Sequence, residues 1–284
     1  MEDAVAQEDF SPRVPHPRWL RRYLNWLGRI ILTIIRTLHG LGAFALITLG
    51  VTVTKFWKAP DVVHPLISQQ ITRAGVRLLP MVGFVAFALG FVVIGQTVSL
   101  LNRYGAQDWA GTVMVTVIVR ELGPLVTALL VLARVGTAIV IELGTNRATG
   151  EVEALEALGI DPIHMLVMPR LLGLAISIFS LTVYMIIVAL CSGYLFAFIQ
   201  DVPLQLREYL NQVTSSLRWQ DFVLLGLKTI SFGTVIAIVT CYQGLARPVQ
   251  INQVAEMTSR AVVESVIACV LLDALFIVVY LVVI

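Results

Sequence analysis

Charged side chains inside otherwise apolar stretches are the residues of this sequence best placed to do chemistry. Arg120 and Glu121 are adjacent within residues 109–141, and Arg134 follows about four helical turns later on nearly the same face. Because charges in such stretches are costly, they mark functional positions by default. The pattern indicates either a polar lining for a ligand with an anionic headgroup or an internal ion pair that fixes helix packing.

Asp273 and Lys228 are the remaining charges within long apolar stretches. Asp273 is expected either to pair with Arg134 or to accept a hydrogen bond within a helix bundle. Lys228 stands near one end of its stretch, so its long side chain is expected to snorkel toward the membrane interface. Asp273 and Arg134 are therefore intramembrane polar candidates, and no catalytic residue is predicted.

The composition indicates that most of the chain lies within a lipid bilayer. Of the 284 residues 58% are hydrophobic and 13% charged, which is about half the charge of an average soluble domain. The same figures exclude a disordered chain, and a net charge of +2 gives no reason to expect a nucleic-acid partner. Three cysteines and four histidines are scattered along the chain, so neither a disulfide framework nor a metal site is expected.

Five apolar stretches are long enough to cross a bilayer, which takes about 20 residues. They cover residues 78–101, 109–141, 171–199, 222–242 and 265–284. Together they predict an all-α polytopic membrane protein with a five-span domain at 78–284.

A sixth apolar stretch, residues 37–54, is only a marginal span because it contains His39 and three glycines. Ten of the 20 Lys and Arg residues lie within residues 1–77. If that segment stays on the cytoplasmic side, 14 basic residues outside the spans lie inside and 3 lie outside, as the positive-inside rule requires. We therefore predict an N-terminal interfacial elbow helix over residues 19–58 and a cytoplasmic location for residues 1–77.

Pro124 predicts an irregular helix in the second span. Residues 109–141 would form a helix of about 50 Å, against a hydrocarbon core of about 30 Å. Proline cannot donate a hydrogen bond to the carbonyl four residues back, which here belongs to Arg120. A kink at this point is expected beside the adjacent charges.

Residues 142–162 predict a structured connection between two spans on the cytoplasmic side. Within it, residues 151–158 place Val152, Leu155 and Leu158 on one helical face, with glutamates elsewhere. Gly159 fits a left-handed helix stop, and the pair Asp161-Pro162 fits the start of the next helix. Such a short acidic helix is either a docking element for a cytoplasmic partner or a plain surface helix. The chain has no P-loop motif to bind ATP itself.

These motifs resemble those of the MlaE/YrbE permeases of MCE-type phospholipid ABC transporters. The resemblance runs through Arg120-Glu121-Leu122-Gly123-Pro124, then Glu142-x-Gly144-x-x-Arg147-Ala148-Thr149, then Ala154-Leu155-Glu156-x-x-Gly159-Ile160-Asp161-Pro162, and Pro169-Arg170. It extends more loosely from about residue 60 to the C-terminus. The chain departs from the family at Gly150, where the family usually has glutamate, so the following helix is expected to begin later.

The resemblance implies a homodimeric permease in a bacterial inner membrane, with a cytoplasmic N-terminus and a periplasmic C-terminus. It implies a cytoplasmic ABC ATPase dimer that binds ATP and magnesium, a periplasmic ring of MCE-domain proteins, and a phospholipid substrate. The family's lipid-binding positions correspond to Leu101, Tyr104, Arg120 and Glu121. Its ATPase-coupling positions correspond to Glu142, Arg147, Glu151, Val152, Leu155, Glu156, Leu158 and Asp161.

Two other functions are compatible with the same residues. A self-contained channel or secondary transporter would use Arg120, Glu121 and Asp273 as an ion relay. A purely structural anchor for a partner complex would need them only for helix packing. Co-purification of an ATPase and ATP-dependent lipid movement would separate the permease from both, whereas a relay would be driven by an ion gradient.

The predicted topology can be tested by labelling a single cysteine placed at Val62, with the native cysteines replaced. Because residues 1–77 are expected to stay cytoplasmic, a membrane-impermeant thiol reagent added to intact cells should leave this cysteine unmodified and should modify it after lysis. Ready labelling in intact cells would contradict both the elbow and the five-span count.

Overall fold

The computed structural model describes residues 37–54, 60–105, 109–199, 206–245 and 253–283, and these residues are almost entirely helical with no strand among them. The chain divides into two compact units, residues 1–43 and 44–284. The candidate site lies in the second unit. Much of the predicted elbow, residues 19–36 and 55–58, lies outside the described residues.

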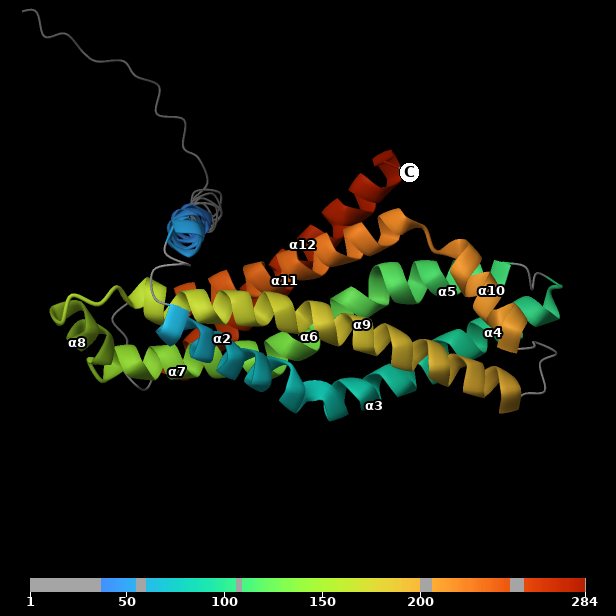
Figure 1. Ribbon diagram of the computed structural model, residues 1–284, viewed down its shortest axis with the longest axis horizontal. Coiled ribbons are helices and arrows are strands. Elements are labelled where there is room, and N and C mark those ends of the chain that lie inside the picture. The colour runs from blue at the N-terminus through green and yellow to red at the C-terminus, as the bar shows by residue number, and fades with distance from the viewer. Residues whose placement is uncertain (1–36, 55–59, 106–108, 200–205, 246–252, 284) are drawn as a thin grey trace, which may run out of the picture. The chain divides into compact units, whose positions relative to one another are not determined.

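Eleven labelled α-helices lie within the described part of the second unit (Figure 1). They are α2 (Pro60–Ala74), α3 (Leu79–Leu89), α4 (Gly95–Arg103), α5 (Ala110–Met114), α6 (Gly123–Val131), α7 (Thr137–Ala148), α8 (Glu151–Ala157), α9 (Met168–Ile199), α10 (Leu206–Ser216), α11 (Trp219–Leu245) and α12 (Val254–Val283). A 3-10 turn, η1 (Val76–Leu78), joins α2 to α3. Four π-helical segments interrupt the longer helices: η2 (Gly90–Ile94), η4 (Val115–Leu122), η5 (Leu132–Gly136) and η6 (Ile163–Val167).

Joined across these interruptions, six helices of the described residues are long and apolar enough to cross a membrane, which confirms an all-α polytopic membrane protein. Five of them match the predicted spans, although the second begins at Ala110 and the fifth ends at Val282, and each extends beyond its apolar stretch on at least one side. The sixth is Thr37–Thr54, with 18 residues. Its assignment as an interfacial helix rests on the charge distribution and stays a prediction.

Helix α9 is the centre of the packing in residues 44–284, where it contacts α2, α3, α6 and α11. Glycines allow the closest of these approaches. A methyl group added to Gly233 of α11 would meet the backbone of Ala175 of α9 at 2.5 Å, and one added to Gly173 of α9 would meet Gln70 of α2 at 2.6 Å. Small residues at such crossings let membrane helices pack backbone to backbone.

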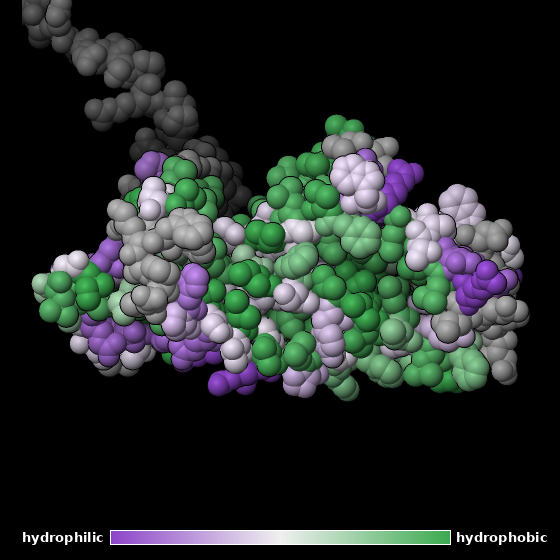
Figure 2. Space-filling model, viewed as in Figure 1, coloured by the Kyte–Doolittle hydropathy of each residue, from purple (hydrophilic) through white to green (hydrophobic). Residues whose placement is uncertain are grey.

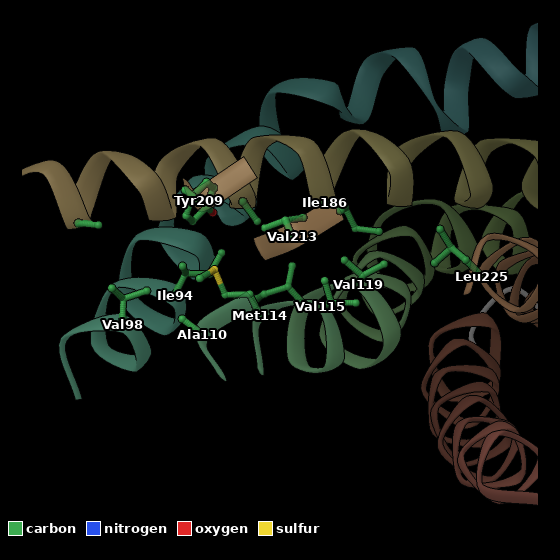
Figure 3. Close-up of a cluster of buried hydrophobic side chains, with 13 residues drawn as sticks. Ile94, Val98, Ala110, Met114, Val115, Val119, Ile186, Tyr209, Val213 and Leu225 are labelled. Carbon is green, nitrogen blue, oxygen red and sulfur yellow. The ribbon is translucent and has the colours of Figure 1, made fainter. Parts of the chain in front are cut away.

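An apolar cluster holds the helix ends near α10 together (Figure 3). Its members come from η2, α4, α5, η4, α9, α10 and α11 and include Ile94, Val98, Met114, Val119, Ile186, Val213 and Leu225. Tyr209 anchors α10 in this cluster because its hydroxyl donates a hydrogen bond to the carbonyl of Leu190 at 2.8 Å. Burial raises the pKa of Tyr209 above its ordinary value, so this side chain remains a neutral donor.

The space-filling view separates apolar and polar surface in the way a bilayer requires. Hydrophobic residues cover the middle of the face shown in Figure 2, and hydrophilic residues gather toward its two ends. Helix α12 is the least enclosed of the five candidate spans from Val63 onward. Only 17% of its most apolar window is buried, compared with 50% for α9 and α11. Its apolar side chains are therefore available to lipid or to another chain.

Candidate functional site

The site begins at the helix irregularity that Pro124 predicts. Over η4 the backbone widens to a π-helix, and the N–H of Gly123 donates to the carbonyl of Ile118, five residues back. Pro124 has no N–H to offer the carbonyl of Arg120. That carbonyl instead accepts a hydrogen bond from Lys228 Nζ of α11 at 2.8 Å. The expected irregularity is confirmed, and a side chain from another helix fills the vacant position.

Lys228 is the centre of a buried ion cluster. Its ammonium group donates to Glu121 Oε2 at 2.9 Å and lies 2.7 Å from Asp273 Oδ1 of α12. Lys228 is only 5% exposed, so the expectation that it snorkels was wrong. Two carboxylates and a carbonyl offer the ammonium better partners than the interface does, because all three already lie within the bundle.

Arg120 forms a second ion pair, with Asp221 near the start of α11. Its Nε lies 2.9 Å from Asp221 Oδ1, and its Nη2 donates to Asp221 Oδ2 at 3.1 Å. Asp221 is 4% exposed and also accepts the backbone N–H of Arg218 at 2.8 Å. The internal ion pair that was one of the two alternatives for Arg120 is present. Its partner is Asp221 and not the adjacent Glu121, because neighbouring residues point in different directions on a helix.

A polar hollow of about 450 Å³ opens beside Arg120. Its lining consists of Thr112, Arg120, Gln212, Ser215, Ser216, Arg218 and Tyr280. The guanidinium of Arg120 also lies over the ring of Tyr280, with its carbon 4.5 Å from the ring centroid, a contact that favours the cation. The contacts with Asp221 use Nε and Nη2 of Arg120, and among the described residues none accepts a hydrogen bond from Nη1.

The other two predicted lipid-binding residues lie elsewhere. Leu101 packs against the apolar cluster that contains Val119, and the side chain of Tyr104 is 80% exposed. Neither of them lines the hollow. Their role in lipid binding stays a prediction.

At the far end of the helices from α10 (Figure 1), three elements meet at Glu142 of α7. Its Oε1 accepts from Arg170 Nη2 of α9 at 2.9 Å, and its Oε2 lies 3.5 Å from Arg73 Nη1 of α2. Arg147, also on α7, forms an ion pair with Glu153 of α8 at 3.2 Å. The predicted coupling segment is therefore tied by charge to the spans that flank it.

The turns around α8 have the predicted form. Gly150 and Gly159 adopt left-handed backbone conformations with φ of 78° and 75°, which glycine adopts at no steric cost. Helix α8 begins at Glu151, after Gly150, as expected. The carboxylate of Asp161 accepts the backbone N–H of Ile163 at 3.0 Å and so caps the start of η6.

The apolar face predicted for this helix is divided. Val152 is 1% exposed and packs against its own chain, whereas Leu158 is 75% exposed. The reason is that α8 ends at Ala157, one residue before the predicted end, and Leu158 becomes its C-cap. Leu155 is half-buried, and Glu151 and Glu156 are exposed.

Arg134 does not meet Asp273. Of the two alternatives for Asp273, the pairing with Arg134 was wrong, and the role of polar acceptor within the helix bundle is confirmed. Asp273 is engaged by Lys228. Arg134 lies in η5 and lines a separate groove together with residues of α2 and α7.

Sequence reasoning missed Asp221, Tyr280 and the residues of α10 that line the hollow. Asp221 had a local signal, because an acidic residue in the first turn of a helix binds the free backbone N–H groups there. The α10 residues had none, since their position in the hollow beside Arg120 depends on how α10 folds back onto α5. In the described part of the chain no group of His, Cys, Asp and Glu side chains could hold a metal ion.

Comparison with known proteins assigns this arrangement to a family. Residues 67–279 match the family model described as Permease MlaE. The chain belongs to the MlaE permease family. The match covers every element of the ion cluster and of the coupling segment, so this MlaE-family chain is a transporter subunit rather than an enzyme.

The names of two individual relatives also describe permeases. A probable ABC transporter permease protein of Rickettsia typhi is 31% identical over 81% of this chain and 88% of its own length. The intermembrane phospholipid transport system permease protein MlaE of Haemophilus influenzae is 26% identical over 74% of this chain and 80% of its own length. The chloroplastic protein TRIGALACTOSYLDIACYLGLYCEROL 1 of Arabidopsis thaliana is 28% identical over 72% of this chain and 58% of its own length.

The ion cluster predicts a large and specific effect of removing the lysine. Lys228→Met would leave two carboxylates, Glu121 and Asp273, without their cation, which costs about 3–5 kcal/mol in other buried pairs. We expect a clearly lower midpoint of thermal unfolding in detergent. The triple variant Lys228→Met, Glu121→Gln, Asp273→Asn should recover most of the loss, because no uncompensated charge remains.

The matched control is Arg260→Met, which removes an exposed pair with Glu256 on α12. Surface pairs contribute about 0–1 kcal/mol, so the midpoint should stay close to that of the wild type. A Lys228→Met protein as stable as the wild type would show that the cluster does not hold the spans together.

Proposed function

We propose that this chain is the membrane subunit that passes phospholipids between the inner membrane and a periplasmic MCE-domain partner, powered by a separate cytoplasmic ATPase. The observation that carries the proposal is Arg120, a permanent cation held by buried Asp221 and facing a polar hollow of about 450 Å³. The name of the Haemophilus influenzae relative supports phospholipid as the cargo.

The hollow has the chemistry of a phosphate-binding site. A guanidinium presents planar donors that match phosphate oxygens and cannot lose its charge. Arg218 supplies a second cation at the same wall. The hydroxyl oxygens of Ser215 and Ser216 add polar surface there, while both hydroxyls donate to the carbonyl of Gln212. Asp221 fixes the orientation of Arg120 while leaving Nη1 for the headgroup.

An ion relay finds less support in the same geometry. Glu121 and Asp273 are both held by Lys228, and Asp221 is held by Arg120. A relay needs groups that exchange protons or ions with a continuous path, whereas these carboxylates are fixed by cations. The pairing favours a structural role for the cluster and a ligand-binding role for Arg120.

The proposed orientation places α8 in the cytoplasm and the hollow near the periplasmic side. The exposed surface of α8 combines Leu158 with Glu151, Glu153 and Glu156, which suits an ATPase cleft with apolar and basic walls. ATP and magnesium would bind to that ATPase. The open apolar face of α12 offers a surface for the second copy of a homodimer.

The proposed lipid site predicts the behaviour of one double variant. Arg120→Leu alone would leave the buried carboxylate of Asp221 without its cation. The substitution is therefore combined with Asp221→Leu, so that both charges are removed and apolar side chains occupy their places. We expect the double variant to fold and to form the complex with its ATPase. The amount of phospholipid that co-purifies with it should fall by about tenfold or more, because charge-assisted hydrogen bonds contribute about 1.5–3 kcal/mol. Its ATP-dependent lipid transfer in proteoliposomes should fall in parallel.

Arg260→Leu, which removes an exposed arginine from α12, is the control and should retain lipid and transfer. A stable double variant with full lipid content and full transfer would mean that Arg120 and Asp221 serve packing only.

The coupling segment predicts a second variant with a different readout. Leu158 is exposed within its own chain, so Leu158→Asp should leave the permease folded but place a charge where the ATPase binds, and burying an unpaired charge is costly. We expect the ATPase to be lost on affinity purification. Leu210→Asp, at an exposed leucine of α10, should retain it. Unchanged ATPase binding by the Leu158 variant would exclude α8 as the docking element.

A further inference from the structure

A basic groove lies between α2 and α7, apart from the hollow and from the ion cluster. Its volume is about 230 Å³. The lining consists of Gln70, Arg73, Arg77, Leu78, Arg134, Val135, Ala138, Ile139 and Glu142. Three arginines therefore line one groove. Arg73 of α2 and Arg77 of η1 lie on one side, and Arg134 of η5, which precedes α7, lies on the other.

The groove has an excess of positive charge that the described residues do not neutralise. Glu142 is its one carboxylate, and Arg170 of α9 already binds one of its oxygens at 2.9 Å. The other oxygen lies 3.5 Å from Arg73. Neither Arg77 nor Arg134 forms an ion pair with any residue that the structure describes. Because arginine cannot be deprotonated in proteins, the groove lacks an anion.

The position of Arg134 strengthens this requirement. It lies 14 residues after Arg120 on the same span, about 21 Å along the helix toward α8. It is carried by η5, and π-helical segments within helices are frequent at functional sites. A permanent charge at this depth needs a partner that can reach it from the membrane.

The surroundings of the groove are apolar. Leu78, Val135, Ala138 and Ile139 form its uncharged walls. Next to them in sequence, Val76, Leu79 and Ile141 are exposed to the surface. A phosphate bound by the arginines would thus sit beside surface that suits acyl chains, which no soluble anion requires.

We propose that the basic groove is a second lipid site, which binds the phosphate of an anionic phospholipid at the α8 end of the spans. The proposal rests on the proposed function for its membrane orientation, which makes this the cytoplasmic leaflet. Basic pockets between membrane helices on that side are suited to anionic headgroups. The bound phosphate would also draw Arg73 from its long contact with Glu142, the residue that ties α7 to α9.

Titration of the purified full chain with dioleoylphosphatidylglycerol, followed by native mass spectrometry, tests the proposal. Dioleoylphosphatidylcholine serves as the zwitterionic comparison and inorganic phosphate as the soluble anion. The wild type should bind phosphatidylglycerol more tightly than phosphatidylcholine. The double variant Arg77→Gln, Arg134→Gln should weaken binding of phosphatidylglycerol about 30-fold, since each arginine near an anionic lipid contributes about 1 kcal/mol. It should also abolish the preference for phosphatidylglycerol over phosphatidylcholine.

Arg260→Gln removes an exposed arginine elsewhere and should bind as the wild type does. Arg77→Gln alone changes an exposed side chain and replaces the double variant in the test if that variant does not fold. It should weaken binding of phosphatidylglycerol about fivefold.

Three results would overturn the proposal. The first is unchanged binding of phosphatidylglycerol by the folded variants. The second is displacement of the lipid by millimolar inorganic phosphate. The third is that the variants lose the second copy of the chain but keep the lipid. The readout involves no ATPase. A chain that binds lipid in the groove but moves none with its ATPase would contradict the proposed function alone.

Discussion

The ammonium group of Lys228 connects three spans. Without it these spans would be held together mainly by apolar contacts, which are hardly more favourable than contacts with lipid chains. It binds the carbonyl of Arg120 at 2.8 Å, the carboxylate of Glu121 at 2.9 Å and that of Asp273 at 2.7 Å. In a bilayer, apolar packing gives helices little reason to prefer one another over lipid chains, so polar contacts and close small-residue crossings decide the arrangement. Pro124 contributes to the cluster because it has no N–H to donate to the carbonyl of Arg120, and Lys228 donates to that carbonyl instead.

This constraint also separates the two adjacent charges. Since Glu121 is taken by Lys228, Arg120 turns to Asp221 and to the polar hollow beside α10. The span that carries Arg120 and Glu121 continues to the opposite end as α7, where Glu142 joins it to α2 and α9. A permease of the MlaE family thus has charged groups at both ends of a rigid central bundle, one facing a ligand-sized hollow and one adjoining the coupling helix.

Local rules account for what the sequence could predict. The spans follow from apolar length, the irregular helix from Pro124, and the turns around α8 from Gly150 and Gly159, since each depends on neighbouring residues only. The ion partners could not be predicted, because Arg120 and Asp221 lie 101 residues apart in sequence and Glu121 and Lys228 lie 107 apart. Such pairs depend on which faces of α11 and α12 turn inward, and spans that are apolar on all sides carry almost no signal of that orientation.

The most direct measurement is an experimental structure of the chain with its ATPase and a bound phospholipid, determined in a lipid nanodisc. The ligand site described above predicts density for the phosphate within hydrogen-bonding distance of the Arg120 guanidinium, with Arg218 at the same wall and Asp221 still paired behind it. A phospholipid bound elsewhere, with the hollow closed by side chains and Arg120 engaged only by Asp221, would contradict it.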